Sequence, residues 1–137
     1  MICAQFYWKS DRTALETVKA YIAAEFSPEV VDDVLSVVKI FEKNHLRDQI
    51  SESADTAYQL MKNADAKLSP QARGSWRWRL LYIRATLDRE IYRNYHGEAS
   101  NEVYQQACQE LTKISHAENA VEALRPVCVM TRPADTK

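Results

Sequence analysis

The chain has 137 residues, of which 46% are hydrophobic, and this length suits one domain that buries a core without metal or disulfide support. Its 18 basic and 19 acidic residues are interspersed, so no overall field attracts nucleic acid or anionic lipid. The three cysteines are far apart and lack the spacing of zinc ligands, which argues against a disulfide framework and a zinc site.

No apolar run approaches the roughly 20 residues that a membrane-spanning helix needs. The first residues also lack the basic and apolar regions of a secretion signal. We therefore expect a single domain over residues 1–137, with no cofactor, no nucleic-acid partner and no membrane partner. A cytoplasmic location is the default for such a chain.

Glycine content excludes one class of fold. Only Gly74 and Gly97 occur, whereas hairpin-rich β structure needs many turns with positive φ. We therefore expect an all-α fold of about five helices in antiparallel hairpins. An extended arm is expected over residues 1–10 and a frayed tail over residues 127–137.

The first two helices carry clear start signals. Thr13 and Glu16 have the spacing of a capping box, which predicts a helix from there to Phe26. Ser27 and the proline that follows it form a second start signal. The second helix is expected to close at Asn44 or at the histidine after it.

Three more helices follow. A periodic pattern predicts a third helix over residues 52–67, and the Ser-Pro-Gln sequence at 69–71 starts a fourth. The fourth is expected to run to Tyr95 and to stop at Gly97 as a left-handed cap. The apolar positions of a fifth helix come next: Ala99, Val103, Ala107, Leu111 and Ile114.

The fourth helix carries two apolar stripes instead of one. At 100° per residue, one stripe holds Trp76, Leu80, Ile83, Leu87 and Ile91, and the other holds Trp78, Leu81, Ala85 and Tyr92. A helix with two apolar faces needs neighbours on both sides. We therefore expect the helix over residues 70–95 to be the central one.

Arginines occupy the two seams between these stripes. Asp88 follows Arg84 by one turn, so a partly buried structural ion pair is predicted between the two. Interleaved arginines and aromatic residues also suit stacking on nucleobases or sugar rings, which is the alternative interpretation. Packing is favoured because the aromatic positions coincide with the helical stripes.

Catalytic signatures are missing from the sequence. His45, His96 and His116 are isolated from one another, and two of them fall near predicted helix ends, where a helix-terminal contact is the ordinary role. There is no nucleophile elbow, phosphate-binding loop or zinc-protease motif. We therefore expect no catalytic residue and no activity in this chain alone, with an enzyme in its own right as a remote alternative.

One segment near the N-terminus resembles a known family. Residues 4–33, AQFYWKSDRTALETVKAYIAAEFSPEVVDD, resemble the segment that closes the catalytic barrel of bacterial glycoside-hydrolase-like proteins of the α-glucuronidase-like and hexosaminidase-like kind. The matching residues are Trp8, Asp11, Tyr21 and Phe26. The departures are Lys9 and Ser10, where Asn and Pro are usual, and Ser27, where glycine is usual.

The resemblance implies that the barrel and its acid/base carboxylates belong upstream of this chain. Residues 34–125 are similar to the helical region that trails such barrels, and Trp8 takes the position of a sugar-stacking tryptophan. The function expected on this basis is a non-catalytic helical module related to the C-terminal region of a carbohydrate-active enzyme. The alternative is a stand-alone helical adaptor that binds a peptide or a partner protein.

The N-terminal arm also suggests an assembly. The arm contains three consecutive aromatic residues, Phe6, Tyr7 and Trp8. If this segment evolved in contact with a barrel, these side chains need another apolar surface to cover them in a chain without the barrel. We expect the arm to pair with a second copy in a two-fold homodimer. The alternative is that it lies across a groove between the first and fourth helices of its own chain.

Overall fold

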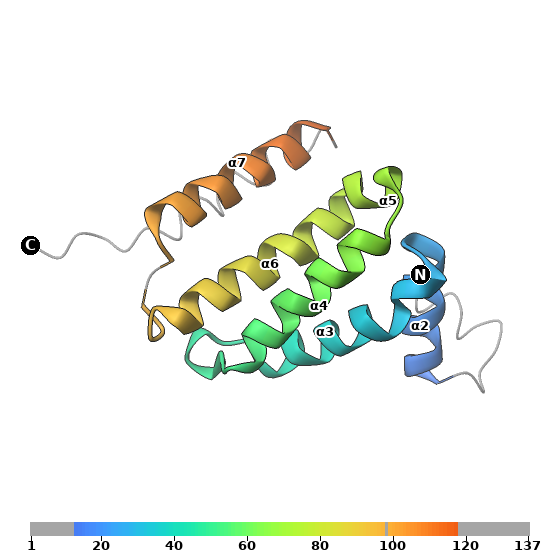
Figure 1. The fold of residues 1–137 in the computed structure, drawn as a ribbon, viewed down its shortest axis with the longest axis horizontal. Coiled ribbons are helices and arrows are strands. Elements are labelled where there is room, and N and C mark those ends of the chain that lie inside the picture. The colour runs from blue at the N-terminus through green and yellow to red at the C-terminus, as the bar shows by residue number, and fades with distance from the viewer. Residues whose placement is uncertain (1–12, 98, 118–137) are drawn as a thin grey trace, which may run out of the picture.

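The structure, a computed structural model, describes residues 13–97 and 99–117 (Figure 1). Within these residues all regular secondary structure is helical and there is no strand, which confirms the all-α prediction. None of the helices described is long and apolar enough to cross a membrane. The predicted arm at 1–10, the tail at 127–137 and Trp8 lie outside the described residues.

The elements follow one another with short connections. In chain order they are α2 (Ala14–Glu25), the 3-10 turn η1 (Pro28–Val30), α3 (Val31–Lys43), the 3-10 turn η2 (Arg47–Gln49), α4 (Ser53–Lys67), α5 (Pro70–Gly74), α6 (Trp76–Arg93) and α7 (Asn101–Ala117). Helices α3, α4, α6 and α7 run in alternating directions (Figure 1). Helix α4 packs against α3 and α6, and α6 in turn packs against α7.

The capping box at the start of α2 is confirmed. The backbone N–H of Glu16 donates to Oγ1 of Thr13 at 3.2 Å, and the backbone N–H of Thr13 donates to Oε2 of Glu16 at 2.8 Å. The helix ends at Glu25, with Phe26 as its C-cap. Two backbone donors that the helix leaves unpaired are thereby satisfied.

The second start signal opens a 3-10 turn before it opens a helix. The Oγ of Ser27 accepts a hydrogen bond from the backbone N–H of Glu29 at 3.3 Å, and Pro28 is the first residue of η1. The α-helix proper begins at Val31 and closes at the predicted C-cap, Asn44. The side chain of Asn44 is buried and donates to Oγ of Ser53 at 3.2 Å.

The prediction of one continuous helix over residues 70–95 is wrong, because the helix breaks at Ser75. That residue has extended backbone angles (φ −64°, ψ 140°), and its Oγ accepts a hydrogen bond from the backbone N–H of Trp78 at 3.3 Å. Ser75 is thus a second N-cap, one residue after Gly74, whose type disfavours a helix interior. The result is the short helix α5 followed by α6.

The predicted left-handed cap at Gly97 is also wrong. The residues with positive φ at the end of α6 are Tyr95 (52°) and His96 (61°). The backbone N–H of His96 reaches back to the carbonyl oxygen of Ile91 at 2.9 Å. Gly97 serves a different purpose, because a Cβ there would lie 2.7 Å from the carbonyl oxygen of Asn94.

The main core lies where α2, α3, α4 and α6 meet. Its largest fully buried apolar side chains are those of Trp78, Met61, Val30, Val34 and Val37. Helix α4 also contributes three alanines without exposed surface, Ala54, Ala57 and Ala64. Small side chains at these positions let the neighbouring helices approach α4 closely.

The two stripes of α6 are buried to different degrees. Trp78 and Ala85 are completely buried against the main core. The other stripe is only half-buried, and Leu80 within it keeps 36% of its surface exposed. Helix α6 is therefore covered more completely on its face toward α4 than on its face toward α7.

Candidate functional site

The histidines and acidic residues do not gather into a metal-binding cluster in the part of the chain that the structure describes. No group of three or more metal-ligating side chains is found there. The Nδ1 atom of His45 lies 3.2 Å from the carbonyl oxygen of Glu42. The ring of His96 packs edge to face against the ring of Tyr92, with ring centroids 6.4 Å apart. Both are contacts at a helix end, as the sequence predicts.

The arginines of α5 and α6 are engaged by carboxylates. The pairs are Arg73 with Asp65, Arg77 with Glu25, Arg79 with Glu110, Arg84 with Asp88, and both Arg89 and Arg93 with Asp55. Three guanidinium groups also lie over aromatic rings of the same chain, with Arg77 over Trp76, Arg84 over Phe41 and Arg89 over Tyr58. These contacts favour the packing interpretation over stacking on nucleobases or sugars.

The ion pair expected between Arg84 and Asp88 is present. Nε of Arg84 lies 2.8 Å from the Asp88 carboxylate, and the same guanidinium donates to the carbonyl oxygen of Asn44 at 2.8 Å. Asp88 is only 3% exposed, so burial raises the pKa of its carboxyl group while the hydrogen bond and charge of Arg84 lower it. The pair ties α6 to the end of α3.

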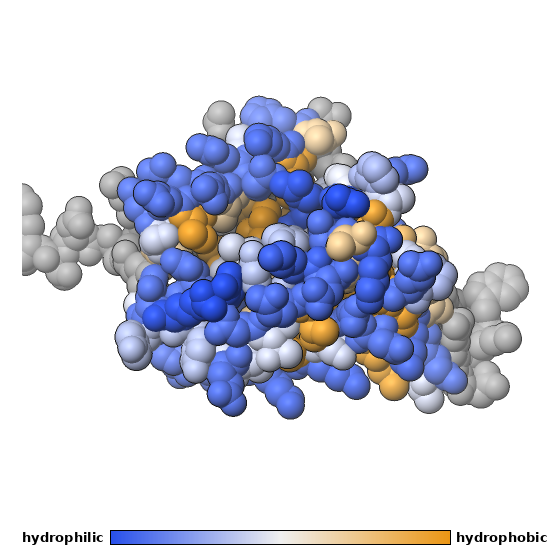
Figure 2. Space-filling view, viewed as in Figure 1, coloured by the Kyte–Doolittle hydropathy of each residue, from blue (hydrophilic) through white to orange (hydrophobic). Residues whose placement is uncertain are grey.

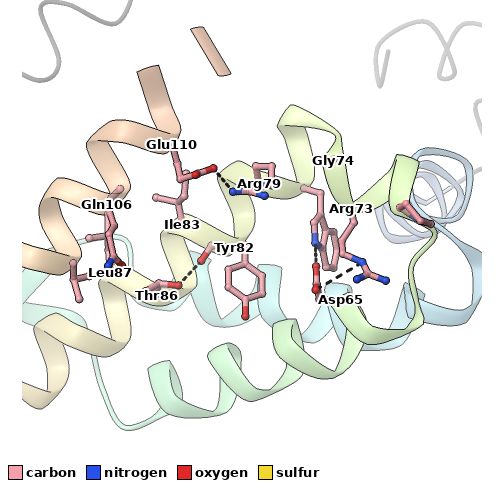
Figure 3. A pocket seen from close by; sticks show the side chains of 14 residues that line it. Asp65, Arg73, Gly74, Arg79, Tyr82, Ile83, Thr86, Leu87, Gln106 and Glu110 are labelled. Atoms are coloured by element: carbon pink, nitrogen blue, oxygen red, sulfur yellow. Dashed lines mark hydrogen bonds and ion pairs between the residues drawn. The ribbon is translucent and has the colours of Figure 1, made fainter. Parts of the chain in front are cut away.

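A groove of about 510 Å³ runs between α6 and α7 (Figure 3). Figure 2 shows apolar residues in this region, surrounded by hydrophilic ones. The apolar side chains that line it are Trp78, Tyr82, Ile83 and Leu87 of α6 and Val103 and Ala107 of α7. This volume and lining are typical of binding sites in proteins.

Two ion pairs stand at the rim of the groove. Arg79 of α6 and Glu110 of α7 form an ion pair that links the two walls (Figure 3), and Lys113 binds the same carboxylate at 3.0 Å. The pKa of Glu110 is lowered, most of all by the hydrogen bond from Lys113. Burial acts in the opposite direction, but the charges of Arg79 and Lys113 and the hydrogen bond from Arg79 add to the lowering. The rim therefore carries compensated charges.

The second pair lies at the end of the groove near α5. Nε of Arg73 is 3.9 Å from the carboxylate of Asp65, which also accepts a hydrogen bond from the indole N–H of Trp78 at 2.8 Å. The Arg73 guanidinium donates to the carbonyl oxygen of Leu68 at 2.9 Å. These polar groups hold α4, α5 and α6 together.

Two further polar side chains line the groove, Tyr82 and Thr86 of α6. Burial, and next the neighbouring Tyr58, raise the pKa of Tyr82 above its ordinary value of 10.0, so its hydroxyl stays protonated at neutral pH. The hydroxyl of Thr86 donates to the carbonyl oxygen of Tyr82 at 2.9 Å.

Sequence reasoning identified both walls of this groove but not the groove itself. Ile83 and Leu87 stand in one predicted stripe, and Val103 and Ala107 stand in another. The ion pair between Arg79 and Glu110 links the two walls, and the space between the stripes is left unfilled. Periodicity in the sequence does not report the distance between two helices.

The chain matches no known protein family, no curated protein and no solved structure. The resemblance of residues 4–33 to glycoside-hydrolase-like proteins therefore stays a prediction. Functional inference for this chain accordingly rests on the geometry of the described residues.

Proposed function

We propose that this chain is a non-catalytic helical adaptor that binds an apolar peptide segment of a partner protein in the groove between α6 and α7. The observation that carries the proposal is the incompletely filled apolar floor between two nearly antiparallel helices. Grooves of this kind accept amphipathic segments that insert two or three apolar side chains.

The size of the groove supports a peptide as ligand. From Trp78 to Leu87 the groove follows ten residues of α6, whose rise corresponds to a length of roughly 14 Å. That length accommodates two or three large side chains of a peptide. Since Arg73 and Arg79 already face carboxylates, an uncharged apolar surface is the complementary ligand.

The same geometry gives less support to a carbohydrate-related module, which remains a second proposal based on the sequence resemblance. Sugar rings stack on exposed aromatic faces. Trp78 in the groove has no exposed surface, and Trp76 is covered on one side by the guanidinium of Arg77 at 4.4 Å. Peptide binding uses the apolar floor without needing an open aromatic face.

The experiment is selection of peptides from a random display library against the full chain. We expect the selected peptides to share two or three large apolar residues, and to bind the Gln106→Trp variant at least tenfold more weakly. Gln106 is exposed and lines the groove, so the indole fills the site without removing any core side chain.

Gln109→Trp is the matched control, because Gln109 is also a glutamine of α7 but does not line the groove. Affinity for the selected peptides should be unchanged in this variant. Equal loss of binding in both variants, or a selection without a shared apolar pattern, would contradict the proposal.

A further inference from the structure

We propose that the ligand of the groove between α6 and α7 is an amphipathic α-helix of the partner protein. Its apolar side chains, at positions i, i+3 or i+4, and i+7, lie on the floor of the groove, and an acidic residue lies at the end that faces α5. This inference rests on the proposed function of the same groove and adds the conformation and the charge of the ligand.

The hydrogen bonds of the groove favour a helical ligand over an extended one. Backbone N–H and C=O groups of an extended peptide need partners when they are buried. The backbone groups in the interior of α6 and α7 are bonded within each helix. Two side-chain donors of the lining are engaged as well. The hydroxyl of Thr86 donates to the carbonyl oxygen of Tyr82, and the indole N–H of Trp78 donates to a carboxylate of α4. A helix satisfies its own backbone groups, so it packs on such a lining without losing hydrogen bonds.

The floor also has the length and the relief that suit a helix. It runs for roughly 14 Å from Trp78 to Leu87, and positions i and i+7 of a helix are about 10.5 Å apart, so three anchors on one face fit within it. Ile83 and Leu87 lie one turn apart on α6, and Val103 and Ala107 lie one turn apart on α7. A third helix whose anchors are one turn apart interdigitates with both rows.

Charge distinguishes the two ends of the groove. The charged residues among those that line it lie toward α5 and away from Leu87 (Figure 3): Asp65, Arg73, Arg79 and Glu110. Lys113, whose side chain is 72% exposed, shares Glu110 with Arg79, so three cations face two carboxylates at this end. An acidic residue of the ligand, just beyond its apolar anchors, is complementary to this excess of positive charge.

The test compares two libraries of synthetic peptides of about 15 residues, which have the same composition and the same acidic residue at one end. In the first library the variable apolar positions are i, i+4 and i+7 on a helix-forming scaffold of alanine, glutamate and lysine. In the second they are i, i+2 and i+4, which lie on one face of an extended chain. Both libraries are selected against the full chain, and the affinities of the selected peptides are measured for the wild type and for Gln106→Trp.

We expect the helix-patterned library to give ligands at least tenfold tighter than the alternating library, and Gln106→Trp to weaken their binding at least tenfold. Proline at a solvent-facing position in the middle of such a ligand should also weaken binding at least tenfold, because it breaks the helix. Alanine at the same position is the control and should leave the affinity unchanged.

The other outcomes separate this inference from the proposed function. Alternating ligands that bind the groove as tightly as the helical ones, or a ligand that tolerates the proline, would overturn the helical conformation and leave the adaptor function intact. If neither library gave ligands that depend on the groove, the adaptor function would be refuted together with this inference.

The acidic end is tested at Lys113, which stands beside the groove without lining it. Lys113→Gln should weaken the helical ligand several-fold at low ionic strength and less at high salt, because salt screens exposed charges. Replacing the acidic residue of the ligand by glutamine should remove this difference. Lys62→Gln is the matched control, since Lys62 is an exposed lysine of α4 outside the groove. Equal losses in the two variants would overturn the acidic complement.

Discussion

The indole N–H of Trp78 donates a hydrogen bond to Oδ1 of Asp65 at 2.8 Å, and this bond joins α6 to α4 at a point where the tryptophan is completely buried. A fully buried indole needs such a partner, because an unpaired N–H in an apolar core costs free energy. The bond also holds Trp78 in the orientation in which Phe26 meets it edge to face, with ring centroids 5.2 Å apart.

This relationship is testable by a double-mutant cycle with Trp78→Phe and Asp65→Ala. A hydrogen bond to a charged group contributes about 1.5–3 kcal/mol, so we expect the two losses in the free energy of unfolding to be non-additive by about that amount. Urea denaturation of the wild type, the two single variants and the double variant gives the coupling free energy between Trp78 and Asp65. Additivity within about 0.5 kcal/mol would show that the bond contributes little.

A second prediction concerns pH and the buried Asp88. Because burial raises the pKa of this carboxyl group above 3.8, the native state holds the proton more tightly than the unfolded chain does. The contribution of Asp88 to the free energy of unfolding therefore falls as pH rises through the window from 3.8 to the raised native pKa, and is largest below it. Asp88→Asn should remove this part of the pH dependence.

The measurement is urea denaturation of wild type and Asp88→Asn between about pH 3.5 and 7. We expect the stability of the variant relative to the wild type to increase with pH across the acid window. Asp48→Asn, at an exposed aspartate of η2, should show no such trend relative to the wild type. A parallel pH profile for Asp88→Asn and wild type would show that Arg84 cancels the effect of burial, and the opposite trend would show that Arg84 outweighs it.

The two glycines should respond in opposite ways to alanine. At Gly97 a Cβ would meet the carbonyl oxygen of Asn94 at 2.7 Å, so Gly97→Ala should lower the free energy of unfolding by about 1–3 kcal/mol. At Gly74 nothing lies within 4 Å of the added Cβ, so Gly74→Ala should raise it by about 0.5–1 kcal/mol. Thermal denaturation of both variants measures these changes in stability. A change of the same sign in both variants would be inconsistent with this geometry.

Tyr95 offers a fourth prediction. Its φ of 52° is unfavourable for a bulky residue, while 94% of its surface is exposed, so little packing is lost on replacement. Asparagine tolerates this conformation better, and Tyr95→Asn should stabilise the protein by about 0.5–1 kcal/mol. Tyr95→Val should destabilise it, because a β-branched residue fits there least well. Melting temperatures that fall in the order Asn, Tyr, Val are the expected result.

Local signals in the sequence are sufficient to predict most helix ends. Thr13 with Glu16, and Ser27 with its following proline, act through hydrogen bonds that span three residues or fewer, so their spacing alone identifies them. Periodicity does not reveal the break at Ser75, because both apolar stripes begin only after it, at Trp76 and Trp78. A serine directly after Gly74 is the signal that the sequence offers.

Local sequence signals do not predict features that depend on distances between helices or between backbone groups. The requirement for glycine at position 97 comes from the approach of a carbonyl group, and the left-handed conformation belongs to the two residues before it. The half-buried state of Leu80 has a similar origin, since periodicity places a residue on a face but does not say how closely the neighbouring helix covers it.

The charge of α6 has a consequence for how this chain acquires its structure. The helix holds five arginines and two carboxylates, Asp88 and Glu90, and Arg89 lies one turn before Arg93, where like charges repel. Asp88 of the same helix pairs with Arg84, but the carboxylates that pair with the other four arginines belong to other helices: Glu25 of α2, Asp55 of α4 and Glu110 of α7. Alone, α6 is therefore a poor nucleus for folding. During synthesis on the ribosome, Arg79 gains its carboxylate partner, Glu110, only after α7 has emerged, and α7 is the last helix of the described residues.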